Sequence, residues 1–277
     1  MARDFSKNIV VNEQTRRFKI HLPDSMKKGE KLPLIIVLHG AASYASLIEF
    51  VTRMSRKADR EKFCVVYPNG TARTLGLIRT WNTGIARGPA YKRKIDDVKF
   101  IDRIIENMII EHKVDEKRIY VAGMSNGGMM AYRIASELSD KVAAVGVVQA
   151  AMFGEMPDQG KPVNMIVFHG DKDKVFPLNG GRGKWFVYRF DTPSTMETIN
   201  YWVKRNNCRD EPEIFMKNGV AKYTYGGGTD NTEVVFYKIS NGGHFWPGGR
   251  RFPVFYRPSK KISATDEMCK FFFSHSK

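Results

Sequence analysis

Residues 123–127 read Gly-Met-Ser-Asn-Gly, the pattern of a nucleophile elbow, in which a serine side chain projects from a sharp turn. A largely apolar run at 118–122 precedes this segment and predicts a strand, and Met130, Ile134 and Leu138 follow it at helical spacing. A strand, a turn and a helix in this order hold the serine over a helix N-terminus, where developing negative charge is stabilised. The context makes Ser125 the candidate nucleophile.

A serine hydroxyl needs a general base within hydrogen-bond reach, because it is barely ionised at neutral pH. Of the six histidines, His244 alone lies in a glycine-rich loop after the last expected strand. The glycines at 242–243 would let its ring swing over the elbow, so we predict His244 as general base and then general acid. His39 and His169 each precede a glycine directly after a buried strand, where ring packing or a hydrogen bond to a neighbouring loop is the usual role.

A carboxylate must fix the tautomer of the catalytic histidine and stabilise its positive form. Asp171 and Asp173 both follow the expected strand at 165–168 and precede His244. Either choice gives the chain order Ser, Asp, His, which is that of α/β-hydrolases. Either aspartate could instead cap a turn, so the residues alone leave the choice open.

The oxyanion of a tetrahedral intermediate needs backbone donors. The N–H of Asn126, directly after the nucleophile, is one candidate. The loop after the expected strand at 34–38 offers the second, most simply through the N–H of Ala41. Losing one such donor typically costs ~10²–10³ in turnover.

These loops depend on strands and helices that alternate from residue 32 to the end of the chain. The runs at 32–38, 142–148 and 165–168 are almost wholly apolar, which is typical of strands buried on both faces of a parallel sheet. A hairpin with strands near 10–11 and 18–22 is expected before them, and Asp96-Asp97 suits the start of a long helix. Without a linker or repeat, the pattern predicts one α/β domain over residues 1–277, with a mostly parallel central sheet flanked by helices.

Composition narrows the class of protein. The chain is 42% hydrophobic and 27% charged, as in ordinary globular proteins, and its longest apolar run is strand-sized, so no membrane partner is expected. Cys64, Cys208 and Cys269 lack metal-ligand spacing, so a zinc site is not expected. The expected serine chemistry needs neither a metal nor a cofactor. The N-terminus has no apolar signal-peptide core.

The formal net charge of +16 is high, and one denser basic patch at 250–261 interleaves Phe252, Phe255 and Tyr256 with its cations. No helix-turn-helix, zinc-finger or RNA-binding signature organises the charge, so no nucleic acid is expected. A well-solvated surface is the first interpretation, and an acidic polymer substrate is the second.

Several motifs recur in this order in one known family. They are Leu-His-Gly at 38–40, Tyr-Pro-Asn-Gly at 67–70, Trp-Asn at 81–82, Asp-Asp-Val at 96–98, the elbow at 123–130, His-Gly-Asp-Lys-Asp at 169–173 and Gly-His-Phe-Trp-Pro-Gly at 243–248. With them the chain resembles the polyhydroxybutyrate depolymerase and feruloyl esterase family of α/β-hydrolases. The joint occurrence of the motifs is far more specific than any one of them.

This resemblance implies a serine carboxylesterase that works through an acyl-enzyme. It favours Asp173, the fifth residue of the His-Gly-x-x-Asp segment, over Asp171 as the acid. It also suggests that Trp81 and Trp246 border the substrate cleft, where a flat ring stacks on an aromatic acid or a sugar; packing beneath a loop is the alternative. Many secreted members carry a disulfide after the late helix, and here Cys208 fits one half without a partner.

The expected substrate is an ester, free or polymer-bound, with feruloyl, cinnamoyl or acetyl esters on plant polysaccharide first and a polyester of the polyhydroxybutyrate type as the alternative. A binding module without catalytic activity, which holds a polyanion on its basic surface, is the alternative outside the enzymes. The resemblance favours a secreted or periplasmic protein whose signal has been removed, with a cytoplasmic protein as the alternative. The basic, aromatic loop at 180–189 is individual to this chain, so specificity does not transfer from the family.

Overall fold

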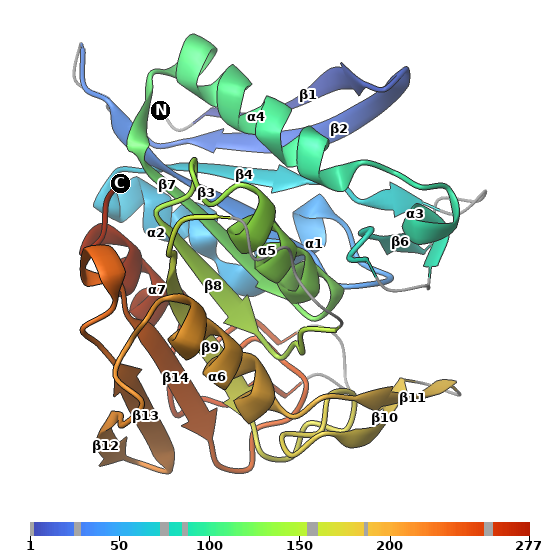
Figure 1. Ribbon diagram of the computed structural model, residues 1–277. Helices are drawn as coiled ribbons and strands as arrows, with labels where there is room; N and C mark the ends of the chain where they lie inside the picture. The colour runs from blue at the N-terminus through green and yellow to red at the C-terminus, as the bar shows by residue number, and fades with distance from the viewer. Residues whose placement is uncertain are drawn as a thin grey trace.

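The computed structural model describes residues 3–24, 29–72, 78–84, 88–153, 160–185, 188–251 and 257–277 (Figure 1). Phe252, Phe255 and Tyr256 of the predicted basic patch lie outside the described residues, as does the tip of the 180–189 loop at 186–187.

Within these ranges, ten strands form one sheet in the order β1-β2-β4-β3-β7-β8-β9-β14-β13-β12. The strands are β1 (Arg3–Val11), β2 (Gln14–Leu22), β3 (Leu32–Leu38), β4 (Cys64–Pro68), β7 (Val114–Met124), β8 (Ala144–Val148), β9 (Asn164–Gly170), β12 (Glu213–Lys217), β13 (Val220–Tyr225) and β14 (Val234–Ile239). The strands from β4 to β14 pair in parallel, whereas both edges are antiparallel. The predicted α/β-hydrolase fold with a mostly parallel sheet is confirmed.

Central strand β3 shows why the apolar runs lack polar alternation. Leu34, Ile36 and Leu38 pack into one hydrophobic cluster, and Ile35 and Val37 pack into a second cluster. Because successive side chains of a strand point to opposite faces, a strand that is covered on both faces must be apolar at every position.

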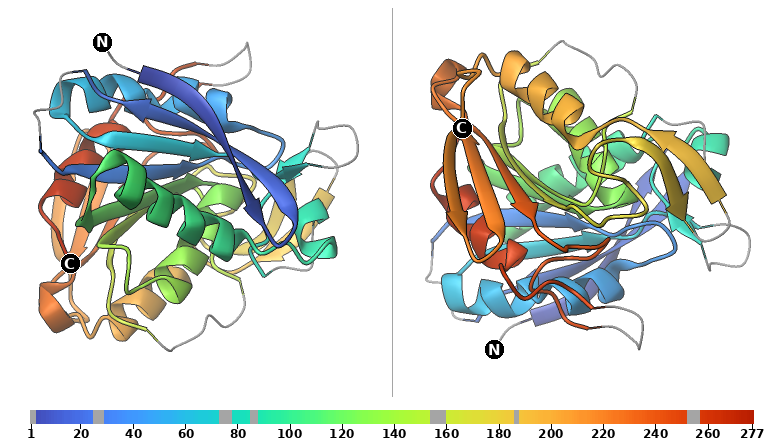
Figure 2. Two further views of the ribbon diagram at one scale, coloured as in Figure 1. Left: turned by 90° about the horizontal axis from the view of Figure 1, so that it is seen from above. Right: turned by 90° about the horizontal axis from the view of Figure 1, so that it is seen from below.

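Helices cover both faces of the sheet (Figure 2). Those that supply residues to the first cluster are α4 (Asp97–His112), α5 (Asn126–Glu137) and α6 (Thr195–Arg205). Those of the second cluster are α1 (Ala45–Thr52), α2 (Met54–Glu61) and α7 (Ala264–Phe273). The capping box predicted by the Ser-Thr-Met-Glu sequence at 194–197 is present at the start of α6.

One expected helix is divided. The apolar spacing from Leu47 to Ala58 predicts a single helix, but α1 and α2 are separated at Arg53, whose φ of 55° is left-handed. The hydrophobic spacing continues across this residue because Val51 and Met54 are buried on the same side of the sheet.

Smaller elements lie outside the predicted pattern. They are β5 (Thr71–Ala72), β6 (Arg79–Thr80), α3 (Gly88–Lys92), the hairpin strands β10 (Gly181–Trp185) and β11 (Tyr188–Thr192), and the 3-10 turn η1 (Thr229–Asn231). Edge strand β12 was also missed, since Ile214, Phe215 and Met216 are all exposed and its sequence therefore carries no burial pattern.

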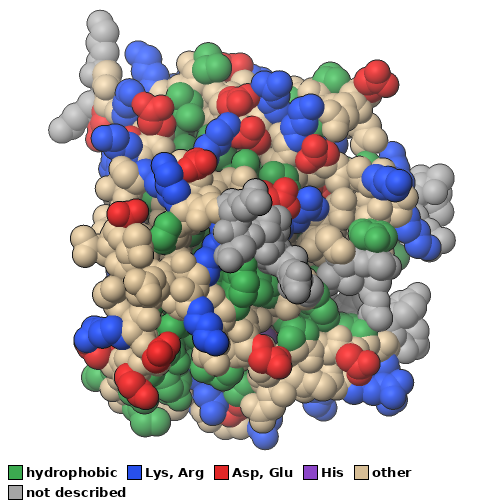
Figure 3. All heavy atoms as spheres, in the orientation of Figure 1, with side chains coloured by type: hydrophobic (Ala, Val, Ile, Leu, Met, Phe, Trp, Pro, Cys, Tyr) green, Lys and Arg blue, Asp and Glu red, His purple; other side chains and the backbone are tan. Residues whose placement is uncertain are grey.

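Charge is distributed rather than gathered on the face seen in Figure 3, where Lys and Arg are interspersed with Asp and Glu. This distribution agrees with a solvated surface on that face. Among the described residues, no helix combines the length and the apolar character that crossing a bilayer requires.

Candidate active site

Ser125 occupies a strained turn between β7 and α5. Its φ of 56° and ψ of −124° are rarely adopted by a residue with a side chain, and such backbone strain costs of order 1–3 kcal/mol. Hydrogen bonds fix the turn: the Ser125 N–H donates to Val148 O at 3.0 Å, and Ser125 O accepts from the Met129 N–H at 2.9 Å. The surroundings therefore hold the serine at the carboxyl end of a central strand.

Glycines at the two flanks of the elbow permit close backbone packing. A Cβ on Gly123 would lie 2.1 Å from Gly127 O, and a Cβ on Gly127 would lie 2.3 Å from Leu38 O. Both distances are far below a real carbon–oxygen contact. The elbow consequently packs directly against the end of β3, where the predicted oxyanion loop begins.

His244 and Asp173 lie together, as the prediction requires. Nδ1 of His244 is 2.8 Å from Oδ2 of Asp173. The other carboxylate oxygen, Oδ1, accepts from the N–H groups of Val175 at 2.8 Å and Phe176 at 3.0 Å. Burial raises the pKa of the Asp173 carboxyl, but the charge and hydrogen bond of His244, together with His169 and the Phe176 N–H, outweigh it and hold that pKa below its ordinary value.

The alternative acid, Asp171, does not contact His244. Its Oδ1 accepts from the N–H of Asn241 at 2.7 Å and thereby ties the loop after β9 to the loop after β14. This is the turn-capping role that the sequence left open for one of the two aspartates.

Ser125 and His244 share a pocket of about 200 Å³, whose wall also includes Gly40 and Ala41. A Cβ on Gly40 would lie 3.3 Å from Cβ of Ser125, so the loop after β3 lies against the nucleophile. In the described part of the chain, the N–H groups of Ala41 and Asn126 have no acceptor. Ala41 lines the pocket, and Asn126 directly follows the serine that does so.

The Asn126 side chain has a role that the sequence analysis missed. Its Oδ1 accepts from the Trp81 N–H at 2.7 Å and so ties the elbow to the loop at 78–84. That loop is fixed in turn by Asp97, whose Oδ2 accepts from the Asn82 N–H at 2.7 Å and whose Oδ1 pairs with buried Arg16 at 2.6 Å.

The Asp-Asp pair at 96–97 is the sequence feature from which this network could have been predicted. Asp96 is the N-cap of α4 and accepts from the Lys99 N–H, so one carboxylate satisfies the helix start. The second carboxylate is fully buried, and a buried charge needs a cationic partner. Arg16 supplies it from β2.

Trp81 and Trp246, expected at the border of the substrate cleft, are 1% and 0% exposed. Nε1 of Trp81 donates to His39 O at 2.8 Å, and Nε1 of Trp246 donates to Thr265 Oγ1 at 3.0 Å. Neither ring offers a face for stacking on a substrate. The geometry corrects the cleft expectation in favour of packing beneath loops.

His39 and His169 make hydrogen bonds to neighbouring loops. His39 contacts Gly40 O through Nδ1 at 2.7 Å and accepts from the Gly70 N–H through Nε2 at 2.9 Å; burial lowers its pKa to about 4. Nε2 of His169 lies 2.7 Å from Phe176 O, and burial lowers the pKa of this histidine as well.

One group of potential metal ligands occurs in the described ranges. Asp4, His21 and Glu49 place ligand atoms within 4.8 Å of one another. Both ring nitrogens of His21 already contact carboxylates, Asp4 at 2.9 Å and Asp59 at 3.1 Å. Glu49 pairs with Lys19 at 2.6 Å, so contacts within the chain account for the cluster. All three cysteines are buried and unpaired, and Cys208 therefore forms no disulfide.

Comparison with known proteins identifies relatives among esterases. The family model described as Esterase PHB depolymerase matches residues 17–175. The chain is 28% identical over 240 residues to a bifunctional acetylxylan esterase/xylanase of Neocallimastix patriciarum and 28% identical over 208 residues to feruloyl esterase B of Piromyces equi. These matches cover 86% and 72% of this chain, but the chain spans only about a third of each relative, 32% and 37%.

Among solved structures, the acetyl xylan esterase from Aspergillus awamori superposes with a TM-score of 0.68 at 14% identity, covering 97% of this chain and 99% of that one. This likeness supports the fold. With more than half of its length matched by the family model, the chain belongs to the Esterase PHB depolymerase family of α/β-hydrolases.

Proposed function

We propose that residues 1–277 form one catalytic domain that cleaves carboxylic esters through an acyl-enzyme, with Ser125 as nucleophile, His244 as general base and acid, and Asp173 as the orienting carboxylate. The observation that supports this most is the 2.8 Å contact between His244 Nδ1 and the buried carboxylate of Asp173. His244 also lines the pocket that contains Ser125. Family membership supports an esterase independently of that geometry.

The proposed reaction begins when Oγ of Ser125 attacks the ester carbonyl and His244 takes its proton through Nε2. Asp173 stabilises the resulting imidazolium, and the N–H groups of Asn126 and Ala41 hold the oxyanion. His244 then gives the proton to the departing alcohol. Water repeats the sequence on the acyl-enzyme and releases the acid.

Plant polysaccharide esters are the substrate class that we propose, since one relative is named an acetylxylan esterase/xylanase and another a feruloyl esterase. The pocket beside Ser125 measures about 200 Å³, below the ~300–1,000 Å³ of sites that enclose drug-sized ligands. Its size favours acetyl over the larger feruloyl or cinnamoyl groups. A polyester depolymerase with the same machinery is the second candidate, which the name of the family model favours.

Labelling with a fluorophosphonate tests the nucleophile, because this probe forms a stable adduct with an activated serine. We expect one adduct by intact mass on the native chain and none on Ser125→Ala. Absence of an adduct on the native chain, or an equal adduct on the variant, would overturn the hydrolase and leave the silent polyanion-binding module. Comparing acetylated xylan, methyl ferulate and a hydroxybutyrate oligomer as substrates then separates the candidate ester classes.

A further inference from the structure

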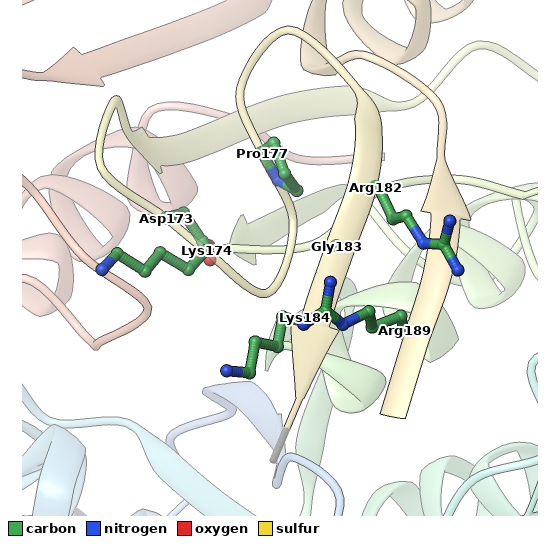
Figure 4. Close-up of a pocket in the computed structure, with 7 residues that line it drawn as sticks. All are labelled: Asp173, Lys174, Pro177, Arg182, Gly183, Lys184 and Arg189. Atoms are coloured by element: carbon green, nitrogen blue, oxygen red, sulfur yellow. The ribbon is translucent and has the colours of Figure 1, made fainter. Parts of the chain in front are cut away.

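A second pocket, of about 360 Å³, lies beside the loop that carries Asp173 and is bordered by the hairpin β10–β11 (Figure 4). Four basic side chains line it together with Asp173: Lys174, Arg182, Lys184 and Arg189. In Figure 4, Lys184 and Arg189 lie side by side, with Lys174 and Arg182 reaching out to either side of them.

The hairpin is fixed against the loop that carries Asp173. The Lys184 N–H donates to Lys174 O at 2.8 Å. A Cβ on Gly183 would lie 2.2 Å from Val175 O, so the two backbones are in direct contact there. The position of the basic side chains relative to Asp173 is therefore set by backbone packing.

Strand register places like charges opposite each other. Lys184 pairs with Arg189 across the hairpin, and a pair of like charges directly opposite is destabilising. Arg182, on the same face as Lys184, pairs with Asp191, so cations still outnumber carboxylates on this face. None of the four basic side chains forms an ion pair with a carboxylate of the described chain. An anion held between Lys184 and Arg189 would relieve their repulsion.

The other face of the hairpin reaches the catalytic histidine. Phe190 packs against Phe176 with ring centroids 5.8 Å apart, and Phe176 packs against His244 at 5.6 Å. The basic pocket consequently lies on the side of the site that holds His244 and Asp173. Because the histidine delivers its proton to the departing alcohol, the alcohol part of an ester must lie near His244.

We propose that the β10–β11 hairpin forms a cationic subsite for a carboxylate on the alcohol part of the ester, so that the enzyme prefers acylated saccharides that contain uronate residues. This inference rests on the esterase function proposed above. The chain's net charge of +16 supports it, since a positive field raises the local concentration of anionic substrate.

The test compares two acetyl esters that differ in one charge, an acetylated methyl glucuronoside and the matching acetylated methyl glucoside. The variant is Lys184→Gln combined with Arg189→Gln, both at exposed positions. The control, Lys204→Gln combined with Lys217→Gln, removes the same charge from exposed positions on α6 and β12. Circular dichroism and the melting temperature verify that all three proteins are folded.

We expect kcat/KM of the hairpin variant to fall roughly 2- to 30-fold for the glucuronoside, the range for two exposed ion pairs, and to change little for the glucoside. The control variant should change neither value by more than about two-fold. Added salt should reduce the preference of the native enzyme for the glucuronoside, because the pocket is open to solvent.

Equal losses on both esters, or equal losses in both double variants, would overturn the subsite. A selective loss seen instead with a nitrophenyl hemisuccinate, which carries its carboxylate on the acyl part, would overturn its placement on the alcohol side. Hydrolysis of the glucoside without any preference for the glucuronoside refutes the subsite alone. If the native enzyme takes up the fluorophosphonate but cleaves none of these esters, the subsite alone is refuted. If it also takes up no fluorophosphonate, the proposed function fails and the subsite fails with it.

Discussion

Nδ1 of His244 lies 2.8 Å from Oδ2 of Asp173, although 71 positions separate the two residues in the chain. They follow β14 and β9, neighbouring strands that run in parallel, so their loops leave the same edge of the sheet. The Lys172 N–H also donates to Gly242 O at 2.9 Å, which joins the acid loop to the histidine loop through the backbone.

Replacing Asp173 by Asn should lower kcat by on the order of 10⁴, because an amide cannot stabilise the imidazolium and favours the wrong tautomer. Asp171→Asn is the matched control two residues away. Its Oδ1 accepts from the Asn241 N–H, and an Asn amide oxygen can accept the same bond. Steady-state kinetics on one ester should therefore show activity near that of the native enzyme for this control. The reverse ranking of the two variants would make Asp171 the acid.

Gly127→Ala should unfold or strongly destabilise the elbow, since the new Cβ would lie 2.3 Å from Leu38 O. Forcing extra carbon into packed structure typically costs ~1–3 kcal/mol, and here both partners are backbone. Gly226→Ala is the control, because its Cβ would meet only the flexible Arg209 side chain at 3.5 Å. Thermal unfolding should show a lowered melting temperature for the first variant alone. Equal melting temperatures would contradict the close backbone contact between the elbow and β3.

The sequence predicted the parallel sheet because its central strands are buried on both faces and are therefore apolar throughout. Local patterns also predicted the cap of α4 at Asp96 and the capping box of α6. Elements with little burial or few residues were missed, β12 above all, since periodicity records which face a residue buries and β12 buries neither.

Chain order and loop position indicated Ser125 and His244 but left Asp171 and Asp173 open as the acid. Only the family resemblance favoured Asp173. What the sequence could not supply was the contact between distant side chains. Trp81 stands in a loop without periodicity, and its indole N–H donates to His39 O, a contact that no local pattern encodes. The pairing of Asp97 with Arg16 likewise joins positions 81 residues apart.

Trp246→Phe tests whether this ring packs or binds substrate. We expect a stability loss with KM unchanged, because the buried indole donates to Thr265 Oγ1 and contributes about 1 kcal/mol through that bond. Trp202→Phe is the control, since its Nε1 finds no partner in the described part of the chain and the same ring volume is lost. Urea unfolding should show a larger loss in the free energy of unfolding for Trp246→Phe than for Trp202→Phe. A raised KM with unchanged stability would instead indicate contact with substrate.

Stability should depend on pH through His39. Burial lowers its pKa from the ordinary value of 6.5 to about 4, so between these values the unfolded chain binds a proton that the folded chain does not. The free energy of unfolding must then rise with pH across this window. This contribution of His39 is complete above pH 6.5, decreases as pH falls towards 4, and amounts to about 3 kcal/mol in total.

His39→Gln removes that titration together with the hydrogen bonds of the ring to Gly40 O and from the Gly70 N–H. The variant should be least stable relative to the native protein above pH 6.5, and the difference should shrink by about 3 kcal/mol towards pH 4. Urea unfolding at a series of pH values gives the free energy of unfolding of both proteins. The contributions of the other titrating groups cancel in the difference between the two free energies. A difference that stays constant over the window would mean that His39 takes up its proton in the folded protein as readily as in the unfolded chain.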